Sequence, residues 1–190
     1  MGKIFRALCA SALLLGLPGL AWSDAPTPLQ PVPSLNIERY LGRWYEIAKF
    51  PNWFQRKCTA DTTADYTLNP DGSVRVVNQC RTSAGEMLQA AGQAKQIGGD
   101  ASPRLRVRFA PEWLSFLPFL WGDYWVVDLD EAYALAAVSE PGRDYLWILS
   151  RTPTVDSVQY EALLSRLARM GLDIGRLEKS PQPLALRSPS

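Results

Sequence analysis

The chain has 190 residues, of which 47% are hydrophobic and 21% are charged. These proportions are typical of one globular domain with a sizeable core, and they exclude an intrinsically disordered chain. With 20 basic and 19 acidic residues, the chain lacks the basic excess that binding to nucleic acid or to an anionic membrane surface through net charge requires.

The first 23 residues have the pattern of a cleaved signal peptide. Lys3 and Arg6 precede an apolar run, and Ala21-Trp22-Ser23 then places small residues at the two positions that signal peptidase reads. The run is too short to span a membrane, and Cys9 lies too early to be the acylated cysteine of a bacterial lipoprotein. We therefore expect export to the periplasm, peripheral contact with the outer membrane at most, and no lipid anchor.

Residues 24–34 follow as a leader that is rich in proline. Four prolines in eight residues predict an extended segment without a packing pattern. We expect the folded domain to cover residues 35–180, with a short helical turn at 36–41, and residues 181–190 to form a C-terminal tail.

Short segments rich in β-branched and aromatic residues come next, separated by turn residues at close spacing, which predicts an all-β meander. The clearest link is Asn69-Pro70-Asp71-Gly72, which has the chemistry of a hairpin turn. Eight antiparallel strands can remove their exposed edges by closing into a barrel whose interior holds side chains or one small ligand. A flat two-sheet sandwich is the alternative. The predicted strands cover 43–50, 61–69, 74–81, 86–97, 103–109, 121–129, 132–139 and 144–150.

A single helix is predicted after the last strand. Thr152 is the expected N-cap and Pro153 the first helical residue. Apolar residues then recur at helical spacing until Gly171 ends the segment. This amphipathic pattern predicts an α-helix that packs on the outside of the barrel.

Two cysteines remain in the mature chain, Cys58 and Cys80. An exported chain meets an oxidising compartment, and the two residues flank the hairpin around 69–72. We expect them to form a disulfide at the open end of the barrel, although two separate buried thiols are the alternative.

Three motifs together resemble the lipocalin family: GRWYEI after a short helical turn, GDYWVVDLD in the sixth strand, and DYLWILSRTP before a lone helix. The resemblance covers residues 35–177 and is strongest to the bacterial outer-membrane type and its apolipoprotein D-like and plant relatives. It implies an eight-stranded up-and-down β-barrel with one helix outside. It also implies binding of fatty acids or lysophospholipids in connection with maintenance of the cell envelope.

Trp44 and Arg151 lie at the start of the first strand and the end of the eighth, which share one end of a meander. A guanidinium lying across the indole would close that end and contribute about 0.5–2 kcal/mol. The tryptophan and arginine of lipocalins play this role, and Gly42, Trp44 and Arg151 match them. The alternative is that Trp44 contacts a ligand.

The opposite end is then the open mouth, and two of its links are unusually apolar. Trp53 and Phe54 lie in one link, and Trp113 and Phe116 lie in the other. Loops normally face water, so these residues indicate ligand binding or transient membrane contact. A lid in which the loops cover one another is the alternative.

The predicted inner wall is largely apolar, which suits acyl chains. Tyr66, Asn78 and Phe109 lie on its predicted inward faces, and the two polar groups among them either orient a headgroup or are hydrogen-bonded core groups. On the sixth strand we expect Trp125 to point inward, because the opposite choice would bury Asp128 without a partner at a cost of several kcal/mol, on the order of that for an unpaired polar group.

The chain contains no histidine, no glycine-rich phosphate loop and no cysteine cluster at zinc spacing, so we expect no metal, no cofactor and no enzymatic activity. The expected function is binding, storage or transport of a small hydrophobic ligand, such as a fatty acid or lysophospholipid. Two alternatives remain: a module that docks a partner or a membrane through the apolar mouth, and a lipid-converting enzyme that uses an inward Glu46. The sequence does not set the oligomeric state.

Overall fold

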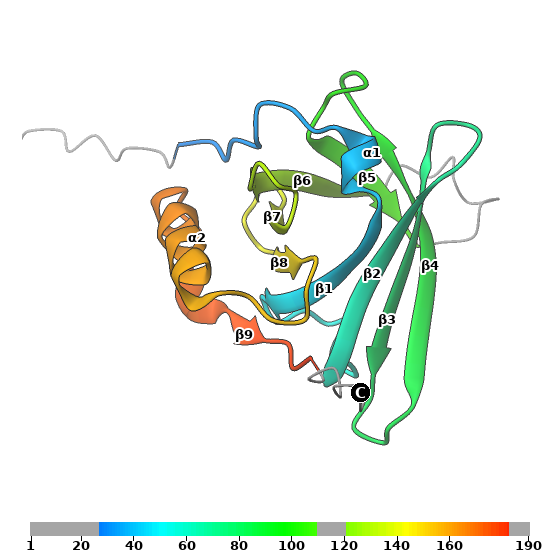
Figure 1. Ribbon diagram of the computed structural model, residues 1–190, viewed down its shortest axis with the longest axis vertical. Coiled ribbons are helices and arrows are strands. Elements are labelled where there is room, and N and C mark those ends of the chain that lie inside the picture. The colour runs from blue at the N-terminus through cyan, green and yellow to red at the C-terminus, as the bar shows by residue number, and fades with distance from the viewer. Residues whose placement is uncertain (1–26, 110–120, 183–190) are drawn as a thin grey trace, which may run out of the picture.

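A computed structural model describes residues 27–109 and 121–182 of the chain (Figure 1). Eight strands and two helices account for most of it, together with a short 3-10 helix and a short ninth strand. In chain order the elements are α1 (Ile37–Tyr40), β1 (Gly42–Lys49), β2 (Ala60–Leu68), β3 (Val74–Arg81), β4 (Met87–Gln96), β5 (Arg104–Arg108), β6 (Gly122–Leu129), β7 (Leu135–Ser139), β8 (Leu146–Ser150), α2 (Ser157–Arg169), η3 (Ile174–Arg176) and β9 (Glu178–Lys179).

The eight long strands form a closed antiparallel barrel, as the sequence predicts. Each strand pairs with its neighbour in the chain, and β1 pairs with both β2 and β8, which closes the sheet. The flat sandwich is therefore wrong. The strand boundaries agree with the predicted ones to within one residue, except that β8 starts two residues later and β7 three residues later, where residues 130–134 form the turn from β6.

Two apolar cores lie on opposite sides of the barrel wall. The inner core contains Trp44, Tyr66, Val76 and Val126. The outer core lies between α2 and the outer faces of β1 and β6 to β8, and Leu163 and Leu167 of the helix are fully buried in it. Figure 1 shows α2 beside the barrel rather than across either end.

A bulge in β6 makes the predicted orientation of Trp125 wrong. The pairing of β6 with β7 shifts between Val126 and Asp128. Because of this bulge, Trp125 and Asp128 both lie on the outer face, although strict alternation would place them on opposite faces. Val126 belongs to the inner core, whereas Trp125 packs with the outer core and Arg104 lies over its ring, 4.7 Å from the centroid.

Because of the same bulge, Asp128 is not buried inside the barrel without a partner. This carboxylate points outward and accepts two hydrogen bonds from Arg166 of α2, at 2.6 and 2.9 Å. The prediction correctly avoided an unpaired Asp128 inside the barrel, but strict alternation then placed Trp125 on the wrong face.

Helix α2 begins later than predicted. Its N-cap is Asp156, whose carboxylate accepts hydrogen bonds from the backbone N–H groups of Val158 and Gln159. Thr152 instead donates its hydroxyl to the carbonyl of Thr154. A carboxylate that accepts two free N–H groups at a helix N-terminus is a stronger cap than a threonine hydroxyl. The predicted end holds, since Gly171 has the positive φ of +79° that follows the last turn.

Both chain ends of the described region pack on the barrel. Leu29 of the leader is buried in the outer core, and the N–H of Val32 donates to the carbonyl of Val126, so the leader has packing contacts that its proline content concealed. At the other end, β9 pairs with Ala48 and Lys49 of β1, beyond the point where β2 leaves β1.

Candidate ligand-binding site

The closed end of the barrel is built on Trp44. Its side chain is fully buried, and its indole N–H donates to the carbonyl of Tyr40 at 2.9 Å. The guanidinium carbon of Arg151 lies 3.9 Å from the centroid of the Trp44 ring. The predicted contact between these two side chains is therefore present. The guanidinium also donates to three backbone carbonyl oxygens, those of Arg39, Arg43 and Tyr133, at 2.8, 2.9 and 3.2 Å.

Gly42 makes room for this arginine. Its φ is +92°, and a Cβ at this position would lie 3.3 Å from a guanidinium nitrogen of Arg151. Any other residue would be strained there and would crowd the guanidinium. The Gly-x-Trp pattern therefore has a physical reason in this chain.

Three tyrosines lie above Trp44 on the inner side of the closed end. The ring of Tyr40 lies 4.9 Å from that of Trp44 and 5.7 Å from that of Tyr66, measured between centroids. The hydroxyl of Tyr124 is hydrogen-bonded to those of Tyr40 and Tyr66, at 2.9 and 3.0 Å. Burial raises the pKa of Tyr66 to about 12 and those of Tyr40 and Tyr124 well above their ordinary value, so all three hydroxyls are neutral.

The inner face of β4 beyond the tyrosines carries mostly small residues, namely Ala90, Gly92 and Ala94. On β4, Ala90 lies opposite Asn78 and Leu88 lies opposite Cys80. Ala90 is exposed and Leu88 is 38% exposed, although both lie on the inner face of the sheet. Water therefore reaches this face of β4.

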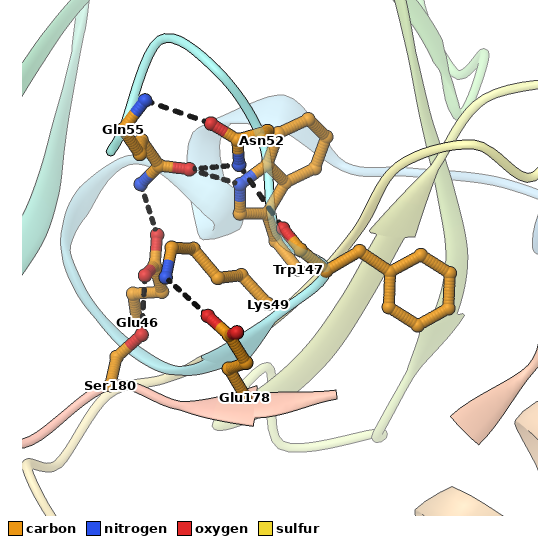
Figure 2. A network of polar contacts seen from close by, with 8 residues as sticks. Glu46, Lys49, Asn52, Gln55, Trp147, Glu178 and Ser180 are labelled. Atoms are coloured by element: carbon orange, nitrogen blue, oxygen red, sulfur yellow. Dashed lines mark hydrogen bonds and ion pairs between the residues drawn. The ribbon is translucent and has the colours of Figure 1, made fainter. Parts of the chain in front are cut away.

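A polar network lies in the open half of the barrel, around the buried carboxylate of Glu46 (Figure 2). The side-chain amide of Gln55 donates to this carboxylate at 2.6 Å. The amide oxygen of Gln55 accepts from the indole N–H of Trp147 at 2.9 Å and from the side chain of Asn52 at 2.7 Å. These contacts fix the orientation of the Gln55 amide and connect β1, β8 and the link between β1 and β2.

The C-terminal segment completes this network. The hydroxyl of Ser180 donates to Glu46, and Nζ of Lys49 lies 3.9 Å from the carboxylate of Glu178. Burial raises the pKa of Glu46, while hydrogen bonds from Ser180 and Gln55 and the charge of Lys49 oppose that shift. Glu46 is thus a hydrogen-bonded inward carboxylate. Ala48 and Phe50, which alternation would place beside it, belong to the outer core because β1 has a bulge between Glu46 and Ala48.

Aromatic side chains join two links at the mouth. Trp53 is 71% exposed and meets Phe54 edge to face. Phe54 also lies near Tyr145 and Trp147, with ring centroids 5.8 and 6.3 Å away. The rings of Tyr145 and Trp147 are stacked with their centroids 5.7 Å apart. The predicted mouth aromatics Trp53 and Phe54 are therefore placed beside the polar network.

The other predicted ligand contacts fall into three groups. One group lies on or over the inner wall, one residue lies outside the barrel, and one group lies outside the described residues. Phe109 is in the first group, since a Cβ on Gly92 would come within 2.6 Å of its ring. Tyr66, Asn78 and Phe109 lie on or over the inner wall, Trp125 lies outside the barrel, and Trp113 and Phe116 lie outside the described residues.

Several residues of the site were missed from the sequence. Trp147 alternates with Leu149 in an apolar strand, so its inward position was readable from periodicity. Tyr124 was missed because the prediction turned Trp125, and therefore the opposite face of β6, toward the interior. Gln55 and Ser180 gave no signal, because a single glutamine or serine in a link or near a chain end is ordinary.

The predicted disulfide is confirmed. Cys58 and Cys80 are bonded, with their Cα atoms 5.4 Å apart. The bond fixes the link that carries Trp53 and Phe54 to the mouth end of β3. Within residues 27–109 and 121–182, three or more potential metal-ligating side chains do not gather in any one place, and neither described helix has the length and apolar content needed to cross a bilayer.

Comparison with known proteins agrees with this architecture. Residues 35–182 match the family model described as "Lipocalin-like domain". Temperature-induced lipocalin-1 of Arabidopsis thaliana is 41% identical over 155 residues, which cover 81% of this chain and 83% of that protein. Outer membrane lipoprotein Blc of Citrobacter freundii is 39% identical over 164 residues, covering 84% of this chain and 88% of the relative.

Solved structures show the same fold at low sequence identity. Insecticyanin from the tobacco hornworm Manduca sexta superposes with a TM-score of 0.63 at 16% identity, covering 83% of this chain and 86% of that one. This likeness concerns the fold alone. The family model and the curated relatives each span most of the chain, and this chain therefore belongs to the lipocalin family, whose members generally bind or transport small hydrophobic ligands.

Proposed function

We propose that the barrel binds, stores or transports a fatty acid, a lysophospholipid or a similar lipid in the bacterial cell envelope, without converting it. The observation that carries the proposal is the inner wall between the two ends. One end is closed by Trp44 and Arg151, and the small inward side chains of β4 leave a wall that water reaches. An apolar interior of this kind favours an acyl chain over a polar solute.

The location is part of the proposal. Bacterial relatives such as Blc are outer membrane lipoproteins by name, which supports an envelope location. We propose that residues 1–23 direct export to the periplasm.

The test uses paired substitutions on one strand. Ala90 faces the interior opposite Asn78, and its neighbour Ala91 lies on the outer face opposite Val77. Delipidated protein is titrated with a fluorescent fatty acid, which is then displaced by palmitate. Ala90→Trp should weaken binding by about tenfold or more because the indole fills the ligand space, whereas Ala91→Trp should change it by less than about twofold.

Two results would contradict the proposal. One is a wild-type protein that binds neither the probe nor a lysophospholipid. The other is an equal loss of affinity in both tryptophan variants, which would place the lipid outside the barrel. A change in the mass of the bound lipid during incubation would instead favour an enzyme.

The mouth supports a second candidate function, which is docking on a membrane. Trp53 is 71% exposed, and Arg56 and Lys57 are exposed in the same link. Exposed aromatics beside basic residues suit the interface of an anionic bilayer. Cosedimentation with vesicles of phosphatidylethanolamine and phosphatidylglycerol should fall in Trp53→Ala, and equal cosedimentation of the two proteins would exclude this role for the link.

A further inference from the structure

The tyrosine cluster at the closed end has one more hydroxyl proton than its hydrogen bonds use. Tyr40, Tyr124 and Tyr66 form an open chain in which Tyr124 is the middle member. Each hydroxyl has one proton to donate. Two bonds use two of the three protons, so one proton in the cluster needs an acceptor from elsewhere.

The positions of the three rings indicate where that proton can be accepted. In a chain of three hydroxyls the free proton belongs to either end or to the middle member, depending on the direction of the two bonds. All three hydroxyls are buried, and the rings of Tyr66 and Tyr124 stand on strands and pack with the inner core. A donor that lacks a partner is costly in a buried position, and a proton left free on Tyr66 or Tyr124 is one that a group inside the barrel can accept.

The surroundings favour an uncharged acceptor. The hydroxyls are neutral, and the nearby side chains of the inner core are apolar, including Val76 and Leu105. Arg151 is already occupied, because its guanidinium lies on Trp44 and donates to three backbone carbonyls. A carboxylate placed at the cluster would lose its hydration and would lie near Glu46, whose charge acts on Tyr66, whereas a hydroxyl or keto oxygen needs only the free proton.

The polar network around Glu46 lies next to the mouth aromatics, on the mouth side of Trp44. The interior therefore has polar groups at the tyrosine cluster and at the network, with apolar side chains of β3 to β5 beside them. A ligand that matches this pattern has a polar head at the mouth and an oxygen at the end that enters first.

We propose that the tyrosine cluster is a hydrogen-bonding subsite for the leading end of the ligand, and that the barrel accepts acyl chains with a hydroxyl or keto oxygen at or near that end. This inference rests on the proposed lipid-binding function and adds the ligand class that the deep end selects.

The experiment compares palmitate with 16-hydroxyhexadecanoic acid, which differs only in a hydroxyl at the far end. Both are titrated into the delipidated full-length protein by calorimetry. An apolar pocket without a partner would disfavour the added hydroxyl by about 10²-fold. The wild-type protein should instead bind the two ligands with dissociation constants within about tenfold of each other, since the hydroxyl is bonded in the complex.

The double variant Tyr66→Phe/Tyr124→Phe removes the two hydroxyls that face the interior, and Tyr160→Phe on the outer helix is the matched control. In the double variant palmitate should bind about as tightly as before, and the hydroxylated acid about 10²-fold more weakly than palmitate. The control should retain the wild-type ratio. Single variants are less informative, because each leaves at least one free proton that Tyr66 or Tyr124 can carry. The one hydroxyl that the double variant keeps, that of Tyr40, belongs to α1 and lies beside Trp44.

The comparison of the two acids on the wild-type protein tests this inference even if the double variant fails to fold. Tight binding of palmitate with binding of the hydroxylated acid about 10²-fold weaker would overturn this inference and leave the proposed function intact. A ratio that is unchanged in the folded double variant would also overturn it. Absence of binding for both acids would refute the proposed function and this inference together.

Discussion

At the scale of single residues, Arg151 holds the closed end through a geometry that only a guanidinium has. One planar group lies 3.9 Å from the centroid of the Trp44 ring and donates to three carbonyls. A lysine ammonium carries the same charge but cannot stack and reach all three acceptors at once. We expect Arg151→Lys to lower the free energy of unfolding by about 1–3 kcal/mol.

Urea denaturation of the purified variants measures this effect. Arg169→Lys is the control, because Arg169 is exposed on the outer helix and should be tolerated within about 0.5 kcal/mol. Equal stability of Arg151→Lys and the control would mean that charge alone closes this end.

Glu46 should give the fold a dependence on pH of definite sign. Its pKa is raised by burial from the ordinary value of 4.5. Below pH 4.5 the carboxyl is protonated in the folded and the unfolded chain, and its contribution to stability is fully present. As the pH rises through the raised pKa, the unfolded chain ionises more readily than the folded one, so that contribution is lost.

The comparison of wild type with Glu46→Gln isolates this group. The difference in unfolding free energy, wild type minus variant, should fall as the pH rises from 4 to 7, because glutamine does not ionise. Glu161→Gln is the control, since Glu161 is exposed on α2. A difference that stays constant or grows with pH would show that burial does not dominate at Glu46.

At the scale of elements, alternation and turn chemistry were sufficient to predict the strands but not their faces. Each of the eight strands was found because its residues suit a pleated sheet and its ends carry turn residues. The faces of β1 and β6 change at bulges between Glu46 and Ala48 and between Val126 and Asp128. A bulge depends on partners in other elements, such as Arg166 for Asp128, and these are invisible in a local pattern.

The same reasoning explains what could be predicted of the candidate site. In a meander, the start of the first strand and the end of the eighth lie at the same end of the barrel. Gly42, Trp44 and Arg151 lie at those strand ends, so they could be assigned to the closed end from the sequence. The tyrosine cluster brings side chains together from three separate parts of the chain, and the polar network does so from four. Which of these side chains meet depends on the tilt and register of all the strands in the barrel, and no single segment of the sequence determines them.

The disulfide links two elements at the mouth and gives a prediction at this scale. Cys58 and Cys80 are separated by 22 residues, and closing a loop of this size stabilises a fold by roughly 3 kcal/mol in the chain-entropy model. The variant Cys58→Ser/Cys80→Ser should lose about that amount, measured by urea denaturation. Because the bond also holds the Trp53 link, uptake of a fluorescent fatty acid should become faster.

Reduction of the wild type provides an independent comparison, since it breaks the same bond without changing the sequence. The reduced protein should match the double-serine variant in stability and uptake rate. If the oxidised and reduced forms melt and take up ligand identically, the bond does not hold the mouth.

At the scale of the whole molecule, the barrel wall is closed partly by the C-terminal segment. Strands β1 and β2 pair only from Gly42 to Tyr45 of β1, and residues 178–182 lie in the gap beyond. The N–H of Ser180 donates to Ile47, and the carbonyl of Pro181 accepts from Asp61 of β2. The side-chain amide of Gln182 donates to the carbonyls of Glu46 and Thr62, at 2.7 and 2.9 Å.

This bridge joins the two strands where they diverge, and it also supplies the Ser180 hydroxyl to Glu46. A chain that stops after Leu177 would leave the backbone edges of β1 and β2 unpaired and would expose one side of the polar network. We expect the truncated protein to unfold at lower urea concentration, with a loss of about 2–4 kcal/mol for several hydrogen bonds and the pairing of β9. Fatty-acid dissociation should become faster, because the wall is open beside the mouth.

A chain that stops after Gln182 is the matched control, because it keeps every bridging contact described above. Stopped-flow release of a fluorescent fatty acid, together with urea denaturation, compares the three lengths of chain. The chain ending at Gln182 should resemble the full chain in both measurements, and the chain ending at Leu177 should differ from it in both. Loss of stability without faster release would mean that the C-terminal segment supports the fold but does not close the path of the ligand.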